Sequence, residues 1–432
     1  MIFGFFKKKE EVQEEEPDLE PVRFLGALNG KDANLAANAR LADAGLVPAK
    51  DLITDAMARR ADTLRIEPKG PQAVVTILID GIAYPSGKLA KAEALAVTQM
   101  LKLLAGLDTK QRKVAQSGGI KAEFDSKPYQ LMVVVTPLPE AERLTVRIVD
   151  LSIKLENPSD LGMSEDLRKK LREITSLKGL LLAVGPPGSG TTTTLYAVLR
   201  GTDAYLSSIF TIGDTGGRNL FNITPFETNP GDSLSTTLDR VVRVEANVIL
   251  IDPIKDAETA KVAISKHEDV MILSEFPAKD AAAGLVQLIE WTGDPKTVAA
   301  AFKGIISQKL LRLLCADCKQ AYRPNKEFLK KAGLPAEATT LYRKPQATQD
   351  PNYEPCRTCG DVGYLGRVAM FELLEPSEEM QQLILKKPDA AAIRAQMKKE
   401  KMLTLLQDGL RLVAEGKTAL EELQRVFKAP EK

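Results

Sequence analysis

Residues 180–196 read Leu-Leu-Leu-Ala-Val-Gly-Pro-Pro-Gly-Ser-Gly-Thr-Thr-Thr-Thr-Leu-Tyr. The apolar run Leu180–Val184 predicts a strand that is buried on both faces of a parallel sheet, and a helix is expected over 192–200. A strand, a glycine-rich turn and a helix in this order are the pattern of a phosphate-binding loop. Polar or helical stretches separate three further short apolar runs, at 208–212, 248–251 and 270–274. This alternation of strands and helices predicts an α/β fold with a doubly wound parallel sheet.

The glycine-rich loop departs from the pattern G-x-x-x-x-G-K-[ST] at one position, where Thr191 replaces lysine. Glycines in such a loop let backbone N–H groups turn inward around an anion, and the following helix adds its positive end. Without the lysine we expect nucleotide affinity to fall roughly ten- to a hundredfold and catalysis to fall further. An ordinary strand–turn–helix connection is the alternative. The candidate nucleotide-binding residues, with the Thr192 hydroxyl placed for Mg²⁺, are Gly185, Gly188, Ser189, Gly190, Thr191, Thr192 and Thr193.

An acidic candidate follows the apolar run Val248–Ile251. Asp252 ends this predicted strand as a Walker B carboxylate would, within reach of Mg²⁺, although buried strands often end in Asp for other reasons. Pro253 comes next, so no glutamate stands there to position or deprotonate an attacking water. Glu275, at the end of the next predicted strand, could lie near in space, but we do not expect it to act as the base.

The four cysteines form two pairs with the same spacing, and 37 residues separate the pairs. Paired C-x-x-C motifs are typical of a tetrahedral Zn²⁺ thiolate site, which is structural when it has no open ligand position. Four cysteines in a long chain without a secretory signal also favour a reducing compartment. Four unlinked thiols or a redox C-x-x-C pair are the weaker alternatives. The expected zinc ligands are Cys315, Cys318, Cys356 and Cys359.

The hydrophobic pattern divides the rest of the chain. In the first part, helical spacing is found near 32–62 and 88–106, and strand signals at 63–85, 120–124, 129–136 and 143–149. The expected domains are a disordered charged tail over 1–30, an α+β domain over 31–150, the α/β loop domain over 151–304, the tetracysteine zinc module over 305–372 and a C-terminal helical subdomain over 373–432.

Composition excludes several classes of function. The 59 basic and 58 acidic residues give a net charge of +1, so no general affinity for nucleic acid is expected. No apolar run approaches the roughly 20 residues that span a bilayer. The tail begins Met-Ile-Phe-Gly-Phe-Phe and lacks the features of a secretory signal; a weak anchor at a membrane surface is the alternative to disorder. The single histidine, His267, lies in a polar turn, which argues against a Ser-His-Asp hydrolase.

From about residue 50 onward, the chain resembles the type II secretion and type IV pilus assembly ATPases. The family's loop, G-P-T-G-S-G-K-[ST]-T-T-L-Y-A, compares with G-P-P-G-S-G-T-T-T-T-L-Y-A at 185–197, and the four cysteines match its tetracysteine module. Its G-Y-x-G-R-x-x-x-x-E-x-L matches 363–374, and its A-S-D-I-H-I-E-P resembles 61–68. The resemblance implies a RecA-like P-loop domain, ATP and Mg²⁺ as cofactors, and a hexameric ring.

The chain departs from the family pattern at the charged positions of the site. The acidic motif E-D-P-x-E is Gly213-Asp-Thr-Gly-Gly217, which leaves Asp214 as a remnant, and the glutamate of G-E-I-R-D is Pro253 in the segment that begins at Asp252. The segment G-H-L-V-x-S-T-L-H-T compares with 269–278, which holds neither histidine. Asp252 and Asp214 are therefore the candidate catalytic remnants. The arginines implied for the N-terminal domain are replaced by Leu78, Gly119 and Met132.

Loss at all these positions predicts a catalytically impaired homologue, a pseudo-ATPase that acts as a structural or regulatory subunit of a pilus or secretion machine. Its partners would be copies of itself or an active paralogue in a hexameric ring, and inner-membrane platform proteins. We expect it to be cytoplasmic, peripheral to the inner membrane. The alternative is a weakly active motor ATPase that uses Asp252 and Thr192 with Mg²⁺. A third hypothesis places another ligand in the old pocket, such as a cyclic dinucleotide or a partner's acidic tail.

Overall fold

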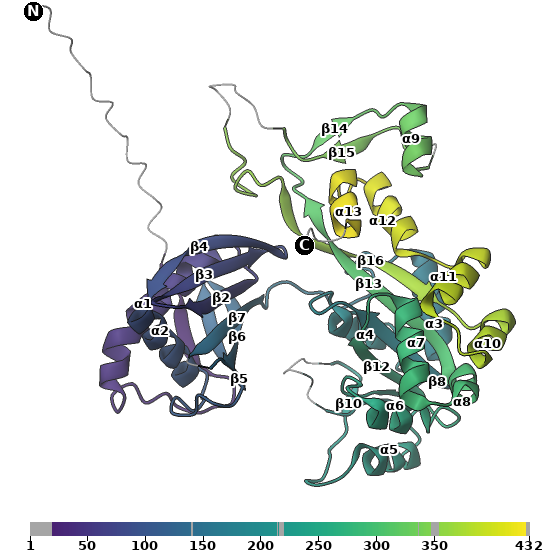
Figure 1. Ribbon diagram of the computed structural model, residues 1–432, viewed down its shortest axis with the longest axis horizontal. Coiled ribbons are helices and arrows are strands. Elements are labelled where there is room, and N and C mark those ends of the chain that lie inside the picture. The colour runs from purple at the N-terminus through teal and green to yellow at the C-terminus, as the bar shows by residue number, and fades with distance from the viewer. Residues whose placement is uncertain are drawn as a thin grey trace, which may run out of the picture. The chain divides into compact units, whose positions relative to one another are not determined.

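The computed structural model describes residues 20–139, 141–213, 215, 220–335, 337–346 and 354–428. The chain divides between Lys154 and Leu155 into two units, Met1–Lys154 and Leu155–Lys432, whose elements are labelled in Figure 1. Within the described ranges, no helix has the length and apolar character needed to cross a membrane.

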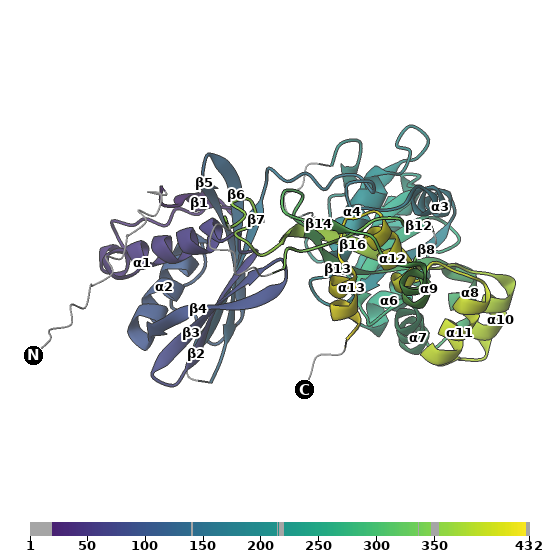
Figure 2. The same ribbon diagram turned by 90° about the horizontal axis from the view of Figure 1, so that it is seen from above.

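The first unit is a seven-stranded antiparallel sheet, in the order β1-β5-β6-β7-β2-β3-β4, with two helices packed on one face (Figure 2). Asp80 (φ +50°) and Gly81 (φ +79°) form the turn between β3 and β4, where the sequence predicted one. The predicted α+β pattern is confirmed. β1 is an edge strand within 1–30, which we expected to be a disordered tail, so the expected boundary at residue 30 was wrong; residues 1–19 of that tail lie outside the described residues. The elements are β1 Arg23–Ala27, α1 Ala39–Ala58, β2 Thr63–Lys69, β3 Gln72–Ile79, β4 Ile82–Ala90, α2 Lys91–Leu104, β5 Gln116–Phe124, β6 Lys127–Pro137 and β7 Glu142–Asp150.

The second unit is built on a seven-stranded sheet in the order β10-β9-β11-β12-β8-β13-β16. Neighbouring strands in it run parallel, except that β16 is antiparallel to β13. The predicted parallel sheet is therefore confirmed, with one antiparallel edge strand added. The strands are β8 Gly179–Gly185, β9 Ile209–Thr211, β10 Thr224–Pro225, β11 Val248–Leu250, β12 Met271–Pro277, β13 Phe302–Leu314 and β16 Tyr364–Leu374.

Helices cover both faces of this sheet. Leu180, Leu182 and Val184 of β8 belong to one core cluster, while Leu181 and Ala183 belong to another. Because successive residues of a strand point to opposite faces, β8 is buried on both sides, as its continuous apolar run predicted. The helices that precede β13 are α3 Glu165–Thr175, α4 Thr191–Arg200, α5 Leu234–Arg243, α6 Ala257–Ile264, α7 Ala281–Thr292 and α8 Pro295–Ala301.

The cysteine region lies between the last residue of β13 and the first residue of β16. We expected the module to span 305–372, but 305–314 and 364–372 are strands of the central sheet. β13 pairs with β8 only as far as Ser307 and continues with β16 to Leu314, so the two strands extend beyond the end of β8. The elements between and after them are β14 Gln320–Tyr322, α9 Lys326–Ala332, β15 Leu341–Arg343, α10 Glu378–Leu385, α11 Ala390–Lys399, α12 Leu405–Ala414 and α13 Leu420–Phe427, which confirms the helical C-terminal part.

A buried ion-pair cluster attaches α13 to β13. The Glu422 carboxylate accepts hydrogen bonds of 2.6–3.1 Å from the backbone N–H and guanidinium of Arg312 and from the guanidinium of Arg425. Burial acts to raise the pKa of Glu422, but the hydrogen bonds from Arg425 and Arg312 outweigh it and lower the pKa to about 2. An unfolded glutamate has a pKa of about 4.3. The carboxylate therefore stabilises the fold above that pH, and this contribution disappears as the pH falls towards the folded value.

Glu422→Gln should lower the free energy of unfolding by about 3 kcal/mol at neutral pH. The difference from the wild type should shrink as the pH is lowered through the window between the two pKa values, because the wild-type carboxylate is then protonated as well. Denaturant unfolding followed by circular dichroism at a series of pH values measures this. Glu421→Gln, at the exposed neighbouring position in α13, is the matched control. A difference that stays constant across the acid range would contradict the assignment.

Candidate functional site

The loop between β8 and α4 has the backbone of a phosphate-binding loop. Gly188 (φ +82°) and Gly190 (φ +88°) lie in the left-handed region, which favours glycine. At Gly185, a Cβ atom would lie 2.3 Å from the Ser189 Oγ, so the turn closes too tightly there for a larger residue. Gly190 is the N-cap of α4, whose first residue is Thr191. The glycines therefore occupy positions that an anion-binding turn requires.

The side chain of Gln308, from β13, lies against this loop. Its Nε2 donates a hydrogen bond to the Ser189 carbonyl at 2.8 Å, and the residue is fully buried. Its Oε1 and the Ser189 Oγ are buried without a hydrogen-bond partner among the described residues. Sequence reasoning missed Gln308, because its hydrogen bond to Ser189 joins positions 119 residues apart and leaves no local signal.

A cavity of about 190 Å³ lies at the carboxyl ends of the parallel strands, next to the loop. Across it, the Thr192 Oγ1 donates a hydrogen bond of 2.5 Å to the Glu275 Oε1. The Asp252 carboxylate lies over Gly213, where a Cβ atom would be 2.1 Å from the Asp252 Oδ1. Asp252 and Glu275 both line the cavity, and its described lining residues include no lysine, arginine or histidine. Among the described lining residues, the charged side chains are therefore the two carboxylates.

The structure brings some of the predicted site residues together. Gly185, Gly188, Ser189 and Gly190 form the turn, and Thr191, Thr192 and Thr193 begin α4. Thr192 lines the same cavity as Asp252. Asp214 lies outside the described residues. Glu275, which we did not expect to act as a base, is the hydrogen-bond partner of Thr192.

Shape and charge give different answers on whether a nucleotide with Mg²⁺ fits. Phosphoryl transfer depends on cations around the phosphates, normally a lysine and Mg²⁺. Here Thr191 offers a neutral hydroxyl, and the two carboxylates would repel a triphosphate. Glu275 also engages the Thr192 hydroxyl that would otherwise contact Mg²⁺. The backbone of the loop fits a phosphate, whereas the described side chains of the cavity do not.

In the first unit, uncharged residues occupy the positions where the resemblance implies arginines. Gly119 of β5 lies directly opposite Met132 of β6. A Cβ atom at Gly119 would lie 2.2 Å from the Leu28 Cδ1, so Leu28 occupies the space that a side chain at 119 would need. The third position, Leu78, lies on β3 opposite Thr63. The unit has therefore packed around uncharged residues at these positions.

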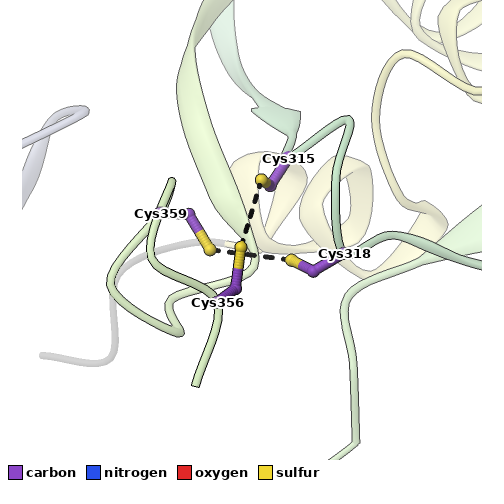
Figure 3. Close-up of side chains that lie close together, drawn as sticks. All are labelled: Cys315, Cys318, Cys356 and Cys359. Atoms are coloured by element: carbon purple, nitrogen blue, oxygen red, sulfur yellow. Dashed lines mark hydrogen bonds between the residues drawn. The ribbon is translucent and has the colours of Figure 1, made fainter. Parts of the chain in front are cut away.

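The four cysteines converge at the far end of β13 and β16 (Figure 3). Their sulfur atoms all lie within 4.8 Å of one another. The Cys315–Cys356 and Cys318–Cys359 sulfur distances are 3.9 and 3.6 Å, too long for disulfide bonds. In a tetrahedral site with Zn–S bonds of about 2.3 Å, two sulfurs lie about 3.8 Å apart. The cluster thus has the donor set and spacing of a tetrahedral thiolate metal site.

Backbone groups around the cluster hold the thiols in place. The Gly363 N–H donates a hydrogen bond to the Cys359 Sγ at 3.3 Å, and the Cys315 N–H donates to the Gly363 carbonyl at 3.0 Å. Burial raises the pKa of the Cys318 and Cys359 thiols. The backbone N–H of Cys359 lowers the pKa of Cys356 to about 7. A pKa near neutrality leaves Cys356 partly deprotonated at pH 7, and a bound metal would deprotonate its neighbours as well.

The fold and the site together define an α/β protein that has a phosphate-loop turn between a buried strand and a helix, and a four-cysteine cluster. The sequence comparisons give the family: the chain belongs to the type II/IV secretion system proteins, whose family model matches residues 44–425. This confirms the resemblance found in the sequence.

Named relatives come from pilus assembly and from secretion. The chain is 30% identical to the type IV pilus assembly ATPase PilB of Myxococcus xanthus, over 88% of this chain and 68% of that protein. It is 29% identical to type II secretion system protein E of Dickeya dadantii, over 87% of this chain and 74% of the relative. For PilB of Thermus thermophilus the identity is 28% over 87% of this chain. The chain spans only 42% of the length of that Thermus protein.

Solved structures support the fold. The Legionella pneumophila ATPase DotB aligns with a TM-score of 0.58 at 14% identity, over 88% of this chain and 95% of that one. The pilus retraction motor PilT with bound ADP aligns with a TM-score of 0.53 at 16% identity, over 88% and 97% of the two chains. At these identities, the likeness concerns the fold alone.

Proposed function

We propose that this chain is a member of the family that hydrolyses ATP inefficiently or not at all and acts as a structural or regulatory subunit of a pilus or secretion machine. The observation that carries the proposal is the charge of the loop cavity. Its described lining residues include the carboxylates of Asp252 and Glu275 and no basic side chain. Hydrolysis would require this cavity to stabilise additional negative charge as the γ-phosphate leaves.

Two substitutions and one hydrogen bond act in the same direction. Thr191 removes a charged donor that contributes roughly 1.5–3 kcal/mol to phosphate binding. Pro253 stands where a glutamate could have positioned the attacking water. The hydrogen bond from Thr192 to Glu275 competes with contact between that hydroxyl and a metal ion. A single change could be compensated, but three changes in the loop and the adjoining cavity favour loss of the reaction.

The second candidate function is a weakly active ATPase in which Asp252 and Thr192 hold Mg²⁺ with ATP. The conformation of the loop favours this alternative, because Gly188 and Gly190 keep the left-handed backbone that lets N–H groups surround a phosphate. Backbone donors alone could retain a nucleotide at low affinity. Binding without turnover would therefore be compatible with both candidates, and turnover separates them.

The assembly is proposed from the named relatives. The chain would join copies of itself or an active paralogue in a hexameric ring and bind platform proteins at the cytoplasmic face of the inner membrane, without contacting nucleic acid. We also propose that Zn²⁺ occupies the cluster of Cys315, Cys318, Cys356 and Cys359, because sulfur distances of 3.6 and 3.9 Å fit a tetrahedral thiolate site. The zinc would hold the ends of β13 and β16 together whether or not ATP is hydrolysed.

Purified full-length protein should release phosphate from Mg²⁺-ATP no faster than a control without protein. Calorimetric titration should show weak binding or none, because the cavity repels the triphosphate. Asp252→Asn and Gly190→Ala variants identify turnover that arises in this cavity. Phosphate release that is well above the control and is abolished by either substitution would contradict the proposal and support the weakly active ATPase instead.

Thr191→Lys should raise ATP affinity roughly tenfold or more without producing turnover. The lysine restores a cation for the phosphates, but Pro253 still leaves the attacking water without a glutamate. Calorimetry and phosphate release on the same preparation measure the two effects separately. Ser235→Lys, at an exposed position in α5, is the matched control because it adds the same charge away from the loop. Clear turnover in Thr191→Lys would show that the catalytic machinery is intact apart from the lysine.

A further inference from the structure

We propose that the acidic segment at residues 10–20 docks on the open face of the sheet in the first unit, where Arg65 and Arg147 are its main contacts. The open face is the side of this sheet that α1 and α2 do not cover. The docked segment occupies the two arginines and keeps acidic partner proteins off this face until it is displaced. The inference is independent of whether the loop cavity hydrolyses ATP.

The two helices of the first unit cover one face of its sheet only (Figure 2). Leu64, Ile66 and Val146 are buried in the core beneath these helices. Because successive side chains of a strand point to opposite faces, the residues between them belong to the open face. Val134 and Val149 on that face are 38% and 36% exposed. Exposed and half-buried threonines and apolar side chains form its centre: Thr63, Thr76, Met132, Val134, Thr145 and Val149.

Two arginines lie side by side in the middle of the open face. Arg65 of β2 is opposite Thr145 of β7, and Arg147 of β7 is opposite Thr63 of β2. The arginines are therefore diagonal neighbours, with a backbone separation of about 7–8 Å. Both are exposed, and neither forms an ion pair or a side-chain hydrogen bond with another described residue.

The nearby carboxylates on this face already have other partners. Glu67 of β2 pairs with Arg143 at 2.5 Å, and Glu123 of β5 pairs with Arg23 at 2.8 Å. They leave the two central arginines without a counter-charge in the described part of the unit. Adjacent guanidinium groups of this kind favour a ligand that carries several carboxylates, since each can bind one through charge-assisted hydrogen bonds.

The chain itself carries such a ligand. The acidic segment contains seven acidic residues and no basic one, and most of it lies outside the described residues. It leads into β1, which begins at Arg23 and is the edge strand of the same sheet. Covalent attachment next to the open face gives the segment an effective concentration in the millimolar range, so weak individual contacts suffice to hold it.

The length of the segment matches the distance to the arginines. β7 and β2 are the third and fourth strands from β1. From the strand spacing and the registers, Arg147 lies roughly 20 Å and Arg65 roughly 28 Å from Arg23. The chain between Arg23 and Glu16 extends to about 24 Å, and the chain between Arg23 and Glu14 to about 31 Å. The run Glu14–Glu16 therefore reaches both guanidinium groups.

Arg147→Lys allows the contact to be measured, because it keeps the charge and adds an amine. Full-length variant protein is treated with a water-soluble carbodiimide, which joins amines to contacting carboxylates without a spacer, and the links are identified by mass spectrometry. We expect a link between position 147 and a carboxylate of Glu14–Glu16. Adding Arg65→Gln should lower its yield roughly three- to tenfold. At about 1 M salt the link should be lost, because the Debye length falls to about 3 Å.

Arg40→Gln, added to Arg147→Lys, is the matched control and should leave the yield unchanged. It removes one positive charge at an exposed position of α1, on the covered side of the sheet. Hydrogen exchange of peptides from β2 and β7 should be the same in every variant, since both substituted arginines are exposed. An equal mixture of unlabelled and isotopically heavy protein shows whether the linked residues come from one chain or from two copies.

Three outcomes would overturn the docking of the segment on its own sheet. They are the absence of a link at position 147, an equal yield with and without Arg65→Gln, and links found only between unlabelled and heavy chains. The last of these would assign the open face to the acidic segment of a second copy. ATP turnover in the phosphate-release assay would contradict the proposed function and leave this inference unaffected.

Discussion

Cys315→Ser should yield a protein without bound zinc, with the ends of β13 and β16 unfolded locally. Cys315 is fully buried at the end of β13, and its sulfur lies 3.9 Å from that of Cys356. Replacing its thiolate with a hydroxyl leaves three thiolates around the metal. Among the described residues, the apolar cluster beside the cysteines has three buried members, Leu314, Tyr364 and Ala419. Small structures of this kind depend on the metal, which supplies about 10–16 kcal/mol in zinc-finger peptides.

Metal analysis of the purified protein and hydrogen exchange of peptides that cover 315–320 and 354–363 measure the two parts of this result. Ala316→Ser is the matched control, because it adds a hydroxyl at an exposed position in the same knuckle and leaves all four thiolates in place. Trp291 fluorescence should not change in either variant, since its contact with Phe276 lies elsewhere in the unit. Wild-type protein without zinc, or a Cys315→Ser protein with a full equivalent of zinc, would refute the site.

The phosphate loop was predictable because its signals are local in the sequence. The apolar run Leu180–Val184 specifies a strand buried on both faces, and β8 contributes alternate residues to two core clusters. Gly188 and Gly190 are glycines in positive-φ positions, which few other residues adopt. The convergence of the cysteines was predictable for a related reason, since two C-x-x-C pairs together supply the four thiolates of one tetrahedral metal site.

The long-range side-chain contacts at the cavity were not predictable in this way. The Thr192–Glu275 hydrogen bond joins residues 83 positions apart, and the Gln308–Ser189 bond joins residues 119 apart. Both contacts depend on which strands are neighbours in the sheet, and local sequence patterns do not determine that order. From the sequence, proximity of Glu275 to the site was only a possibility. In the structure, Glu275 accepts a hydrogen bond from the Thr192 hydroxyl.

The boundaries predicted for the cysteine module, 305 and 372, differ from the structure for another physical reason. Cysteine spacing marks where metal ligands meet, but it carries no information on how far the flanking strands extend. β13 pairs first with β8 and then with β16, so one continuous strand belongs to the sheet at one end and to the cysteine cluster at the other. Residues 305–314 therefore have two roles, which a division by motifs assigns to one domain only.

Lys102→Met should lower the free energy of unfolding of the first unit by about 3–5 kcal/mol. Lys102 of α2 is fully buried, and its Nζ donates hydrogen bonds of 2.7 Å to the Glu142 Oε1 and to the Gln111 carbonyl. Gln99 donates to the other Glu142 oxygen at 2.6 Å. Methionine keeps the length and packing of the side chain but leaves the Glu142 carboxylate buried without a counter-charge. Hydrogen exchange of peptides from α2 and β7 reports this loss locally.

A double variant separates the uncompensated charge from the loss of the lysine itself. Lys102→Met with Glu142→Gln removes both charges and keeps an oxygen that can accept the hydrogen bond from Gln99, so it should recover much of the stability lost in Lys102→Met. Lys91→Met, an exposed position at the start of the same helix, should cost little. If the double variant is no more stable than Lys102→Met, the cost arises from packing or from the Gln111 contact, and the buried charge is not its cause.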